Sequence, residues 1–179
     1  MDGTVIRAAR IADAAQIAVV HVRSWQGAYR GLLPQAYLDG LDPALRVGQW
    51  EHMLAAADSV RTGVFVAEAG RNLLGFVGYS PSRDDHADPD RVGEIDAIYL
   101  LPSAWGKRVG GRLVAAALTR LAEAKFDQVT LWVLDVNVRA CRFYEASGWS
   151  PDGAHKLDES RGFPITEVRY RISLGIVRD

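Results

Sequence analysis

The sequence predicts an α/β fold with a central sheet of mixed strand direction and helices on both of its faces. Two apolar, β-rich runs at residues 64–69 and 73–80 flank a Gly70-Arg71-Asn72 turn, which indicates an antiparallel hairpin. Further along, strand-like runs alternate with amphipathic helical runs, which indicates strand-helix-strand crossovers. Hairpins combined with crossovers are typical of a mixed sheet.

The N-terminal part combines one strand with three helices. Residues 5–8 form a short strand, and Asp13 is suited to cap a helix with an apolar stripe at helical spacing: Ile17, Val20, Ser24 and Trp25. The aromatic stretch that follows is interrupted by glycines and a proline, and it contains a short helix that ends near Gly40. Asp42, followed by a proline, starts a third helix that reaches about Ala57.

Strands and helices alternate in the rest of the chain. A polar loop follows the hairpin, and a strand at residues 92–101 then ends at Pro102. The next helix, at residues 107–124, has one apolar stripe formed by Val109, Leu113, Ala117 and Leu121. The last expected elements are a strand at 127–134, a helix at 138–147 closed by a left-handed Gly148, and strands at 150–157 and 166–174.

Length and composition indicate one domain spanning residues 1–179, because 49% hydrophobic residues can build a substantial core. A net charge of −1 offers no basic field for nucleic acid or an anionic membrane. The N-terminus lacks the apolar run of a signal peptide, and no later run would span a bilayer. Cys141 is the single cysteine, and the four histidines show no metal-ligand spacing. We therefore expect a cytoplasmic protein without a metal.

The main candidate site is the turn in IYLLPSAWGKRVGGRLV, residues 98–114. A strand leads through a glycine-bearing loop directly into a helix, so backbone N–H groups and the positive helix end converge where a phosphate can bind. Lys107, Arg108 and Arg112 add positive charge. An ordinary strand-to-helix turn remains the alternative, because such a loop alone is weak evidence. A magnesium-binding P-loop is disfavoured, since no Ser or Thr follows Lys107.

This region resembles the cofactor motif of the GCN5-related N-acetyltransferase (GNAT) family. In that family two apolar strand residues precede a loop of the form Gln/Arg-x-x-Gly-x-Gly/Ala, and here Ile98 and Leu100 precede residues 105–110 at the same spacing. Two positions differ: Trp105 replaces the Gln or Arg, and Arg108 replaces the central glycine.

A second stretch, NVRACRFYEASGW at residues 137–149, resembles the family's Asn-x-x-Ala-x-x-Phe-Tyr-Glu-x-x-Gly-Phe helix. The N-terminal WQGAYRGLLPQAYL also resembles a segment common in bacterial members, so the resemblance covers almost the whole chain. It implies the GNAT fold, with a mixed, mostly antiparallel sheet of about seven strands and a splay between the fourth and fifth strands. Family members are often dimers, so the resemblance also admits a homodimer.

The resemblance implies acetyl-CoA as cosubstrate, no metal, and direct acetyl transfer to a primary amine of a small molecule, peptide or protein. The pantetheine arm would lie along the strand that holds Ile98. Asn137 resembles the residue that bonds the pantetheine amides, with simple helix capping as its alternative. The residues implied in cofactor binding are Ile98, Tyr99, Leu100, Gly106, Lys107, Arg108, Val109, Gly110, Gly111, Arg112, Asn137, Ala140 and Phe143.

Tyr144 resembles the family's general acid, which protonates the departing thiolate. The alternative is a tyrosine packed at a helix-sheet interface with its hydroxyl bonded. Acyl transfer also needs an oxyanion donor, for which we expect a backbone N–H near Ile98 or Tyr99.

Glu94 stands eleven positions before Trp105, where lysine-acetylating members carry a general base. We expect Glu94 to share a strand face with Asp96 and Ile98, because alternate residues of a strand point the same way. A solvated or paired carboxylate is the alternative role.

Other features are ambiguous. The acidic loop at 83–90 either attracts a cationic amine or is merely solvated, and Trp25, Tyr29 and Tyr37 either line an acceptor pocket or belong to the core. Cys141 is expected to be a packing residue. Two other functions remain open: a non-catalytic acyl-CoA-binding or sensing domain, and a nucleotide-binding domain that uses the same loop.

Overall fold

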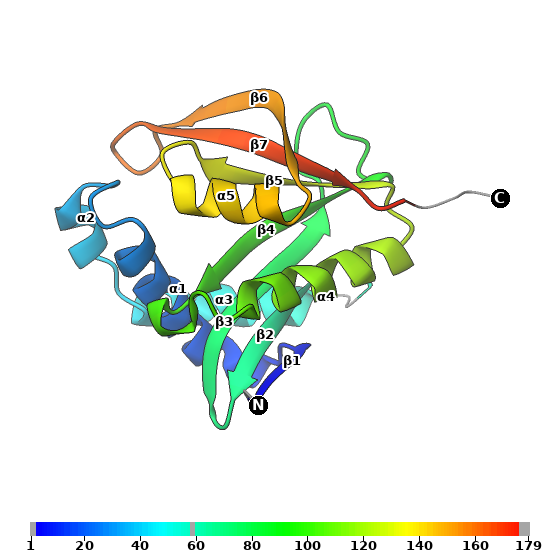
Figure 1. Cartoon of the computed structure of the whole chain (residues 1–179). Coiled ribbons are helices and arrows are strands. Elements are labelled where there is room, and N and C mark those ends of the chain that lie inside the picture. Colours follow the sequence, from blue (N-terminus) through cyan, green and yellow to red (C-terminus); the bar gives the residue numbers. More distant parts are fainter. Residues whose placement is uncertain (1–2, 58–59, 176–179) are drawn as a thin grey trace.

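The computed structural model describes residues 3–57 and 60–175, and its centre is a seven-stranded sheet (Figure 1). The strand order is β1-β2-β3-β4-β5-β7-β6, and every neighbouring pair is antiparallel except β4 and β5. The mixed, mostly antiparallel sheet is thus confirmed. Its strands are β1 (Thr4–Ala8), β2 (Gly63–Ala69), β3 (Asn72–Pro81), β4 (Val92–Leu100), β5 (Gln128–Leu134), β6 (Ser150–Asp158) and β7 (Ile165–Ser173).

Helices cover both faces of the sheet, as the sequence predicts (Figure 1). On one face α1 and α3 enclose a core with Ile17, Trp50 and Phe76, and on the other face α4 and α5 pack over Val77 and Val129. The helices are α1 (Ala14–Ala28), α2 (Gln35–Asp39), α3 (Ala44–Ala56), α4 (Val109–Glu123) and α5 (Val138–Ala146), with short 3-10 turns η1 (Ile11–Asp13) and η2 (Pro102–Ala104).

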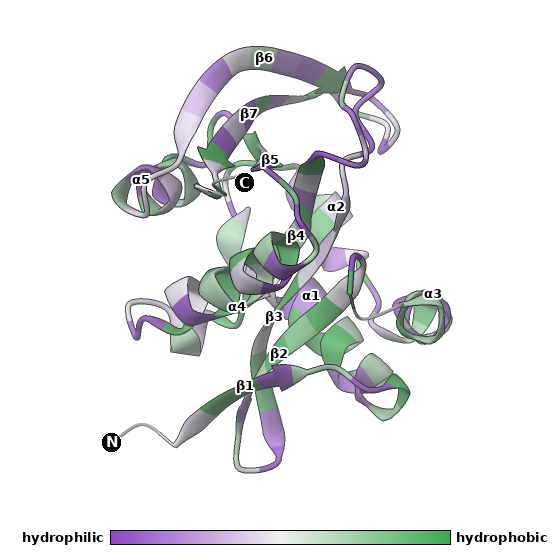
Figure 2. Ribbon diagram, turned by 90° about the vertical axis from the view of Figure 1, so that its right-hand side faces the viewer, coloured by the Kyte–Doolittle hydropathy of each residue, from purple (hydrophilic) through white to green (hydrophobic). Residues whose placement is uncertain are grey.

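The predicted stripe of α4 is buried along its whole length. Val109, Leu113, Ala117 and Leu121 are each at most 1% exposed. Burial of one aliphatic side chain contributes about 1.5–3 kcal/mol, so this face fixes the helix firmly on the sheet. Figure 2 shows the same division, with hydrophobic residues gathered along β2, β3 and α4. The start of α4, which carries the candidate loop, is therefore held at a defined place.

Strands β4 and β5 diverge halfway along their length. They pair in parallel only from Val92 with Gln128 to Ile95 with Leu131. Beyond that point β4 continues its pairing with β3 as far as Leu100, while β5 continues with β7. The predicted splay between the fourth and fifth strands is confirmed.

Asp13 occupies the N-cap position of α1, as predicted, but its side chain does not cap that helix. Its carboxylate accepts a hydrogen bond from the backbone N–H of Arg10 at 2.7 Å and pairs with both terminal nitrogens of Arg7 at 2.7 and 2.9 Å. No side-chain bond caps α1. The Asp13 carboxylate instead closes the 3-10 turn η1, which precedes α1, and α1 begins at Ala14, directly after Asp13.

Strand β4 contains a bulge at Asp96. Gly78 of β3 pairs with Ala97, and the next β3 residue, Tyr79, pairs with Ile95. Asp96 is therefore an extra residue on β4 with no partner of its own on β3. An extra residue shifts the alternation of side chains by one position.

This bulge makes part of a sequence prediction wrong. Glu94 and Asp96 do point the same way, since both pair with Arg83 at 2.9 and 3.1 Å. Ile98 does not join them: it packs in the same core as Ile95, on the α4 face of the sheet. A regular strand would have placed Ile98 beside Asp96, but the bulge reverses its side.

Candidate active site

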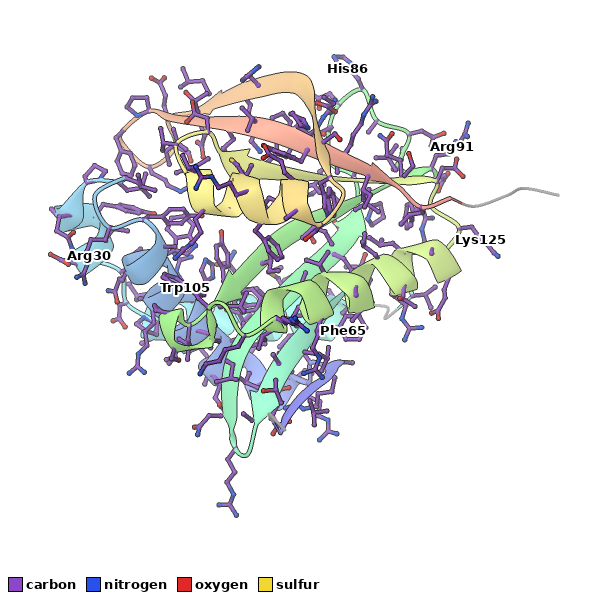
Figure 3. The ribbon with its side chains drawn as sticks, in the orientation of Figure 1. Arg30, Phe65, His86, Arg91, Trp105 and Lys125 are labelled. Carbon is purple, nitrogen blue, oxygen red and sulfur yellow. The ribbon has the colours of Figure 1, made fainter. Side chains whose placement is uncertain are left out.

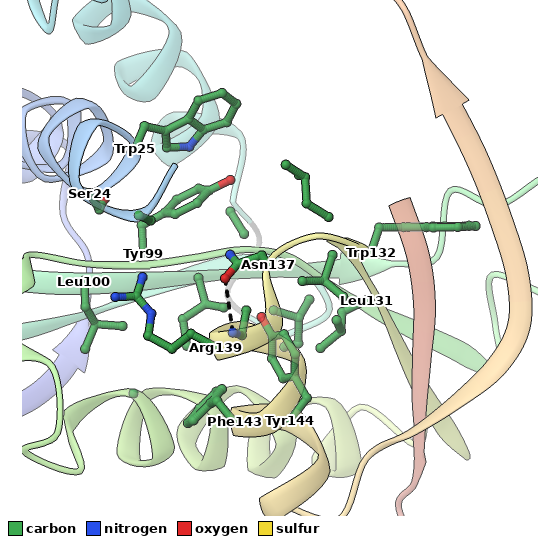
Figure 4. Close-up of a pocket in the computed structure, with 18 of the residues that line it drawn as sticks. Ser24, Trp25, Tyr99, Leu100, Leu131, Trp132, Asn137, Arg139, Phe143 and Tyr144 are labelled. Atoms are coloured by element: carbon green, nitrogen blue, oxygen red, sulfur yellow. Dashed lines mark hydrogen bonds between the residues drawn. The ribbon is translucent and has the colours of Figure 1, made fainter. Parts of the chain in front are cut away.

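A cavity of about 960 Å³ opens where β4 and β5 diverge. Side chains from α1, α4, α5, β4, β5 and β7 line it (Figure 4). Both stretches with the strongest motif resemblance, the loop before α4 and the start of α5, reach this one cavity. The splay therefore joins residues that are far apart in the sequence.

The backbone of β4 offers hydrogen-bonding groups to this cavity. The N–H of Leu101 donates to the carbonyl of Leu74 on β3 at 2.8 Å. Because successive residues of a strand direct their peptide groups to opposite neighbours, those of Leu100 and Ile98 point into the splay and those of Tyr99 point toward β3. Of the two residues expected near the oxyanion, Ile98 is the one with a suitably directed N–H.

The loop before α4 presents several backbone N–H groups at one point. Gly106 has φ 71°, and Arg108 has φ 61° and ψ 6°, so the loop uses the left-handed conformation twice. The N–H of Arg112 makes the first bond of α4, to the carbonyl of Arg108 at 3.2 Å. The preceding N–H groups of the first turn have no intrahelical acceptor, which is the arrangement that binds anions.

The three predicted cations of this loop are placed differently. Arg108 and Arg112 line the cavity, whereas Lys107 is exposed and lies outside its lining. The guanidinium of Arg112 donates to the carbonyl of Thr4 on β1 at 3.1 Å. Of the two arginines that line the cavity, Arg108 is therefore the one more available to a ligand.

Trp105 takes a role that the sequence did not indicate. Its indole Nε1 donates to the carbonyl of Leu100 at 3.2 Å, so it occupies one acceptor of the splayed strand. The guanidinium of Arg139, from the first turn of α5, lies 3.4 Å from the centre of the Trp105 ring. The contact joins the two sides of the cavity, α5 and the loop.

The first turn of α5 presents Asn137 to the cavity. Its Oδ1 accepts a hydrogen bond from the N–H of Ala140 at 3.2 Å, so the capping alternative is correct as far as that oxygen is concerned. The side-chain amide nitrogen can still donate to a ligand. Phe143 lies next to Gly110, where an added Cβ would be 3.4 Å from the Phe143 ring. The glycine lets the loop and α5 approach closely.

Tyr144 is buried, and its ring packs against Phe143 and Trp149 at 5.2 and 6.0 Å between ring centres. Its hydroxyl makes no hydrogen bond to any residue that the structure describes, and it points into the cavity (Figure 4). Burial raises the pKa of Tyr144, so the hydroxyl stays protonated at neutral pH. The alternative of a packed tyrosine with a satisfied hydroxyl does not fit this geometry.

Glu94 and Asp96 form a carboxylate pair around Arg83. Glu94 is buried and accepts hydrogen bonds from the backbone N–H and the Nη2 of Arg83 at 3.0 and 2.9 Å. Asp96 accepts from the hydroxyl of Ser80 at 2.7 Å. Burial raises the pKa of Asp96 to about 6. This value is close to neutral pH, where a group that takes up and releases a proton works best.

Aromatic and charged side chains form the far end of the cavity. Trp25 of α1 and Tyr29, directly after that helix, line it with ring centres 5.1 Å apart, whereas Tyr37 packs on Phe163 outside the lining. The charged pairs at this end are Arg161 with Asp158 and Lys156 with Glu167. The two alternatives for the aromatics are therefore both partly correct, since Trp25 and Tyr29 are core residues that also face the cavity.

Two other ambiguous features can now be located. The loop at 83–90 is anchored at its start, because Asp84 accepts from the Trp132 indole at 3.0 Å and pairs with Arg169 at 2.8 Å. Cys141 lies outside the main cavity and packs near the carbonyl of Leu134.

Sequence reasoning missed Asp96 and Arg139 as site residues. Arg139 lies four residues before Phe143, a spacing that puts both on one side of α5 and could have pointed to it. The sequence does place Asp96 on the Glu94 face of the strand, but its ion pair with Arg83 at 3.1 Å depends on a tertiary contact that the local sequence does not mark.

No three or more histidine, cysteine, aspartate or glutamate side chains come together as a metal site within residues 3–57 and 60–175. In the same part of the chain, every helix is too short or too polar to cross a bilayer.

Comparison with known proteins identifies relatives over most of the chain. The model of the acetyltransferase (GNAT) family matches residues 24–149. The uncharacterized N-acetyltransferase YuaI of Bacillus subtilis is 32% identical over 172 residues, which cover 95% of this chain and 91% of YuaI.

Solved structures have the same fold. The PaiA N-acetyltransferase of Thermoplasma acidophilum, crystallised with coenzyme A, is 18% identical with a TM-score of 0.73, over 95% of this chain and 98% of that one. The acetyltransferase YncA of Salmonella typhimurium, crystallised with acetyl-CoA, is 16% identical with a TM-score of 0.72, over 98% of this chain and 96% of that one. The chain is an acyl-CoA-dependent acyltransferase and belongs to the acetyltransferase (GNAT) family.

Proposed function

We propose that this enzyme transfers an acetyl group from acetyl-CoA directly to a primary amine, within a complex that holds both substrates. The observation that carries the proposal is the cavity at the splay, which exposes the anion-binding loop, the free backbone of β4 and the Tyr144 hydroxyl together. The fold neighbours crystallised with coenzyme A or acetyl-CoA support this choice of donor.

Each part of the cavity suits one part of acetyl-CoA. The N–H groups of residues 106–111 would bind the diphosphate, with Arg108 adding charge. The pantetheine arm would lie along β4, where the peptide groups of Ile98 and Leu100 face the splay. The free amide nitrogen of Asn137 would donate to a pantetheine carbonyl. Ala140 and Phe143 would contact the arm through their apolar surfaces.

The reaction forms a C–N bond and breaks the C–S bond of the thioester. The N–H of Ile98 would stabilise the negative charge that develops on the acetyl oxygen. Tyr144 would give its proton to the departing thiolate, which suits a hydroxyl that is protonated and has no other partner among the described residues.

The amine must lose its proton before or during the attack. We assign this task to the Glu94–Asp96 pair, directly or through water, because both carboxylates line the cavity beside Arg83. Glu94 is the base that the family resemblance indicates. Asp96, with its pKa raised to about 6, adds an acceptor whose protonation changes near neutral pH.

Tyr144→Phe tests the chemistry. Phenylalanine keeps the packing against Phe143 and Trp149 and removes only the hydroxyl. We expect CoA affinity to be unchanged and kcat to fall about 100-fold or more, as for loss of a general acid. Tyr170→Phe is the matched control, since that hydroxyl bonds Glu145 at 2.8 Å outside the main cavity. An unchanged kcat in Tyr144→Phe would remove Tyr144 as the acid.

Ligand-induced stabilisation tests the donor class. A ligand at 100 times its Kd stabilises a protein by about 2.7 kcal/mol, which raises the melting temperature of a chain this long by about 5–10 °C. We expect this shift with CoA and acetyl-CoA and none with ATP or NAD. The reverse pattern would favour a nucleotide-binding domain. Binding without release of CoA thiol across a panel of amines would favour a sensing domain.

A further inference from the structure

Arg139 is an unassigned cation in the cavity. It lines the cavity from the first turn of α5 and forms no ion pair with any residue that the structure describes. The cations at the acceptor end of the cavity are, by contrast, engaged with carboxylates: Arg83 with Glu94, Lys156 with Glu167, and Arg161 with Asp158. A guanidinium without a carboxylate partner keeps its full charge for an anion in the cavity.

Trp105 holds this cation in place. The guanidinium of Arg139 lies 3.4 Å from the centre of the indole ring, within the range of cation–π attraction. The ring itself is fixed, because its Nε1 donates to the carbonyl of Leu100 at 3.2 Å and its outer edge lies near Gly27 of α1. The only polar group of the indole is thus already used, so Trp105 cannot contact a phosphate as a Gln or Arg would.

We propose that Arg139 binds the diphosphate of the acyl-CoA and that Trp105 positions it for this task. The pair would supply, from α5, a charged contact to the diphosphate that Trp105 itself cannot make from the loop. The position of Trp105 supports this, since it immediately precedes the N–H groups of residues 106–111. Figure 4 shows Arg139 between Asn137 and Leu100, on the loop side of the cavity. This inference rests on the proposed function.

Arg139→Gln tests the inference against a matched control. Loss of a charged hydrogen-bonding partner is expected to weaken CoA binding about 10- to 100-fold, as measured by calorimetry. Arg142→Gln removes the same charge from the same helix at an exposed position outside the cavity, and it should leave CoA affinity unchanged. If wild-type protein does not bind CoA, the proposed function fails. If it binds and Arg139→Gln binds equally well, only the present inference fails.

Shortened ligands locate the contact. Dephospho-CoA lacks the 3′-phosphate but keeps the diphosphate, so Arg139→Gln should lose the same factor with it as with CoA. Acetyl-pantetheine lacks both, and its kcat/KM should be equal in Arg139→Gln and wild type. A loss that vanishes with dephospho-CoA would assign Arg139 to the 3′-phosphate and overturn the proposal. An equal loss with acetyl-pantetheine would show a merely structural effect and would also overturn it.

A double-mutant cycle tests the part played by Trp105. Trp105→Leu keeps apolar bulk but removes the ring that attracts the guanidinium. We expect Trp105→Leu to weaken CoA binding by about 2- to 5-fold, the equivalent of an exposed cation–π pair. The same substitution made in Arg139→Gln should cause no further loss. Additive losses would mean that Trp105 acts independently of Arg139.

Discussion

Replacing Arg108 by glycine is expected to stabilise the protein. Arg108 has φ 61° and ψ 6° at the N-cap of α4, a conformation that disfavours any residue with a Cβ. For an L-residue this conformation costs about 1–2 kcal/mol. A glycine variant avoids this cost, but about 0.4–1 kcal/mol is lost again, because glycine has more conformational freedom than alanine in the unfolded chain. The net gain of Gly over Ala at this position is the difference of these two effects, about 0.8 kcal/mol at their mid-values.

The measurement compares Arg108→Gly with Arg108→Ala, since both lack the guanidinium and differ only in the Cβ. Urea unfolding without ligand should give the glycine variant the higher free energy of unfolding, with a melting temperature about 1–4 °C higher. Lys125→Gly and Lys125→Ala form a second matched pair. Lys125 has φ 70°, stands at the opposite end of α4 from Trp105 (Figure 3), and lies outside the cavity. A gain at Lys125 without one at Arg108 would refute the strain assigned to the loop.

Two further predictions concern β4 and its contacts with β3. Gly75→Ala should destabilise the protein by about 1–3 kcal/mol in urea unfolding, because the added Cβ would lie 2.9 Å from the Tyr99 carbonyl oxygen. Gly78→Ala should cost less, because its Cβ would meet only Asp96 atoms at 3.8 Å, and equal losses in the two variants would contradict this prediction. The folded state raises the pKa of Asp96 from 3.8 to about 6, so it holds this proton more tightly than the unfolded chain does. Stability from this group is full below about pH 4 and falls by at most about 1.4 kcal/mol per pH unit as pH rises to about 6; Asp96→Asn should lack this slope, and identical slopes would exclude it.

Much of the fold could be predicted because its signals are local. The Gly70-Arg71-Asn72 segment lies between two β-rich runs, and in the structure β2 ends at Ala69 and β3 begins at Asn72, which pairs with Ala69. The stripe of α4 repeats at helical spacing, and Gly148 ends α5 with φ 85° as expected. These patterns depend on residues a few positions apart, so a single sequence contains them.

Several features of the site could not be predicted, because they depend on tertiary pairing. The bulge at Asp96 arises from the register of β4 against β3, and on β4 itself no glycine or proline stands at it. It puts Ile98 on the α4 face, away from Glu94 and Asp96, which both face Arg83. The contact of Arg139 with the Trp105 ring likewise joins two residues that are 34 positions apart in the sequence.

The two departures from the family loop have a common physical explanation. A left-handed Arg108 is tolerated because the residues after it are held by the core: Val109 and Leu113 are at most 1% exposed. Burial of two such side chains contributes about 3–6 kcal/mol, which exceeds the roughly 1–2 kcal/mol cost of the left-handed conformation. The loop can therefore keep its shape without the central glycine. Its N–H groups remain directed at the cavity, and the charge that Trp105 cannot supply comes from Arg139, which the same tertiary packing brings beside it.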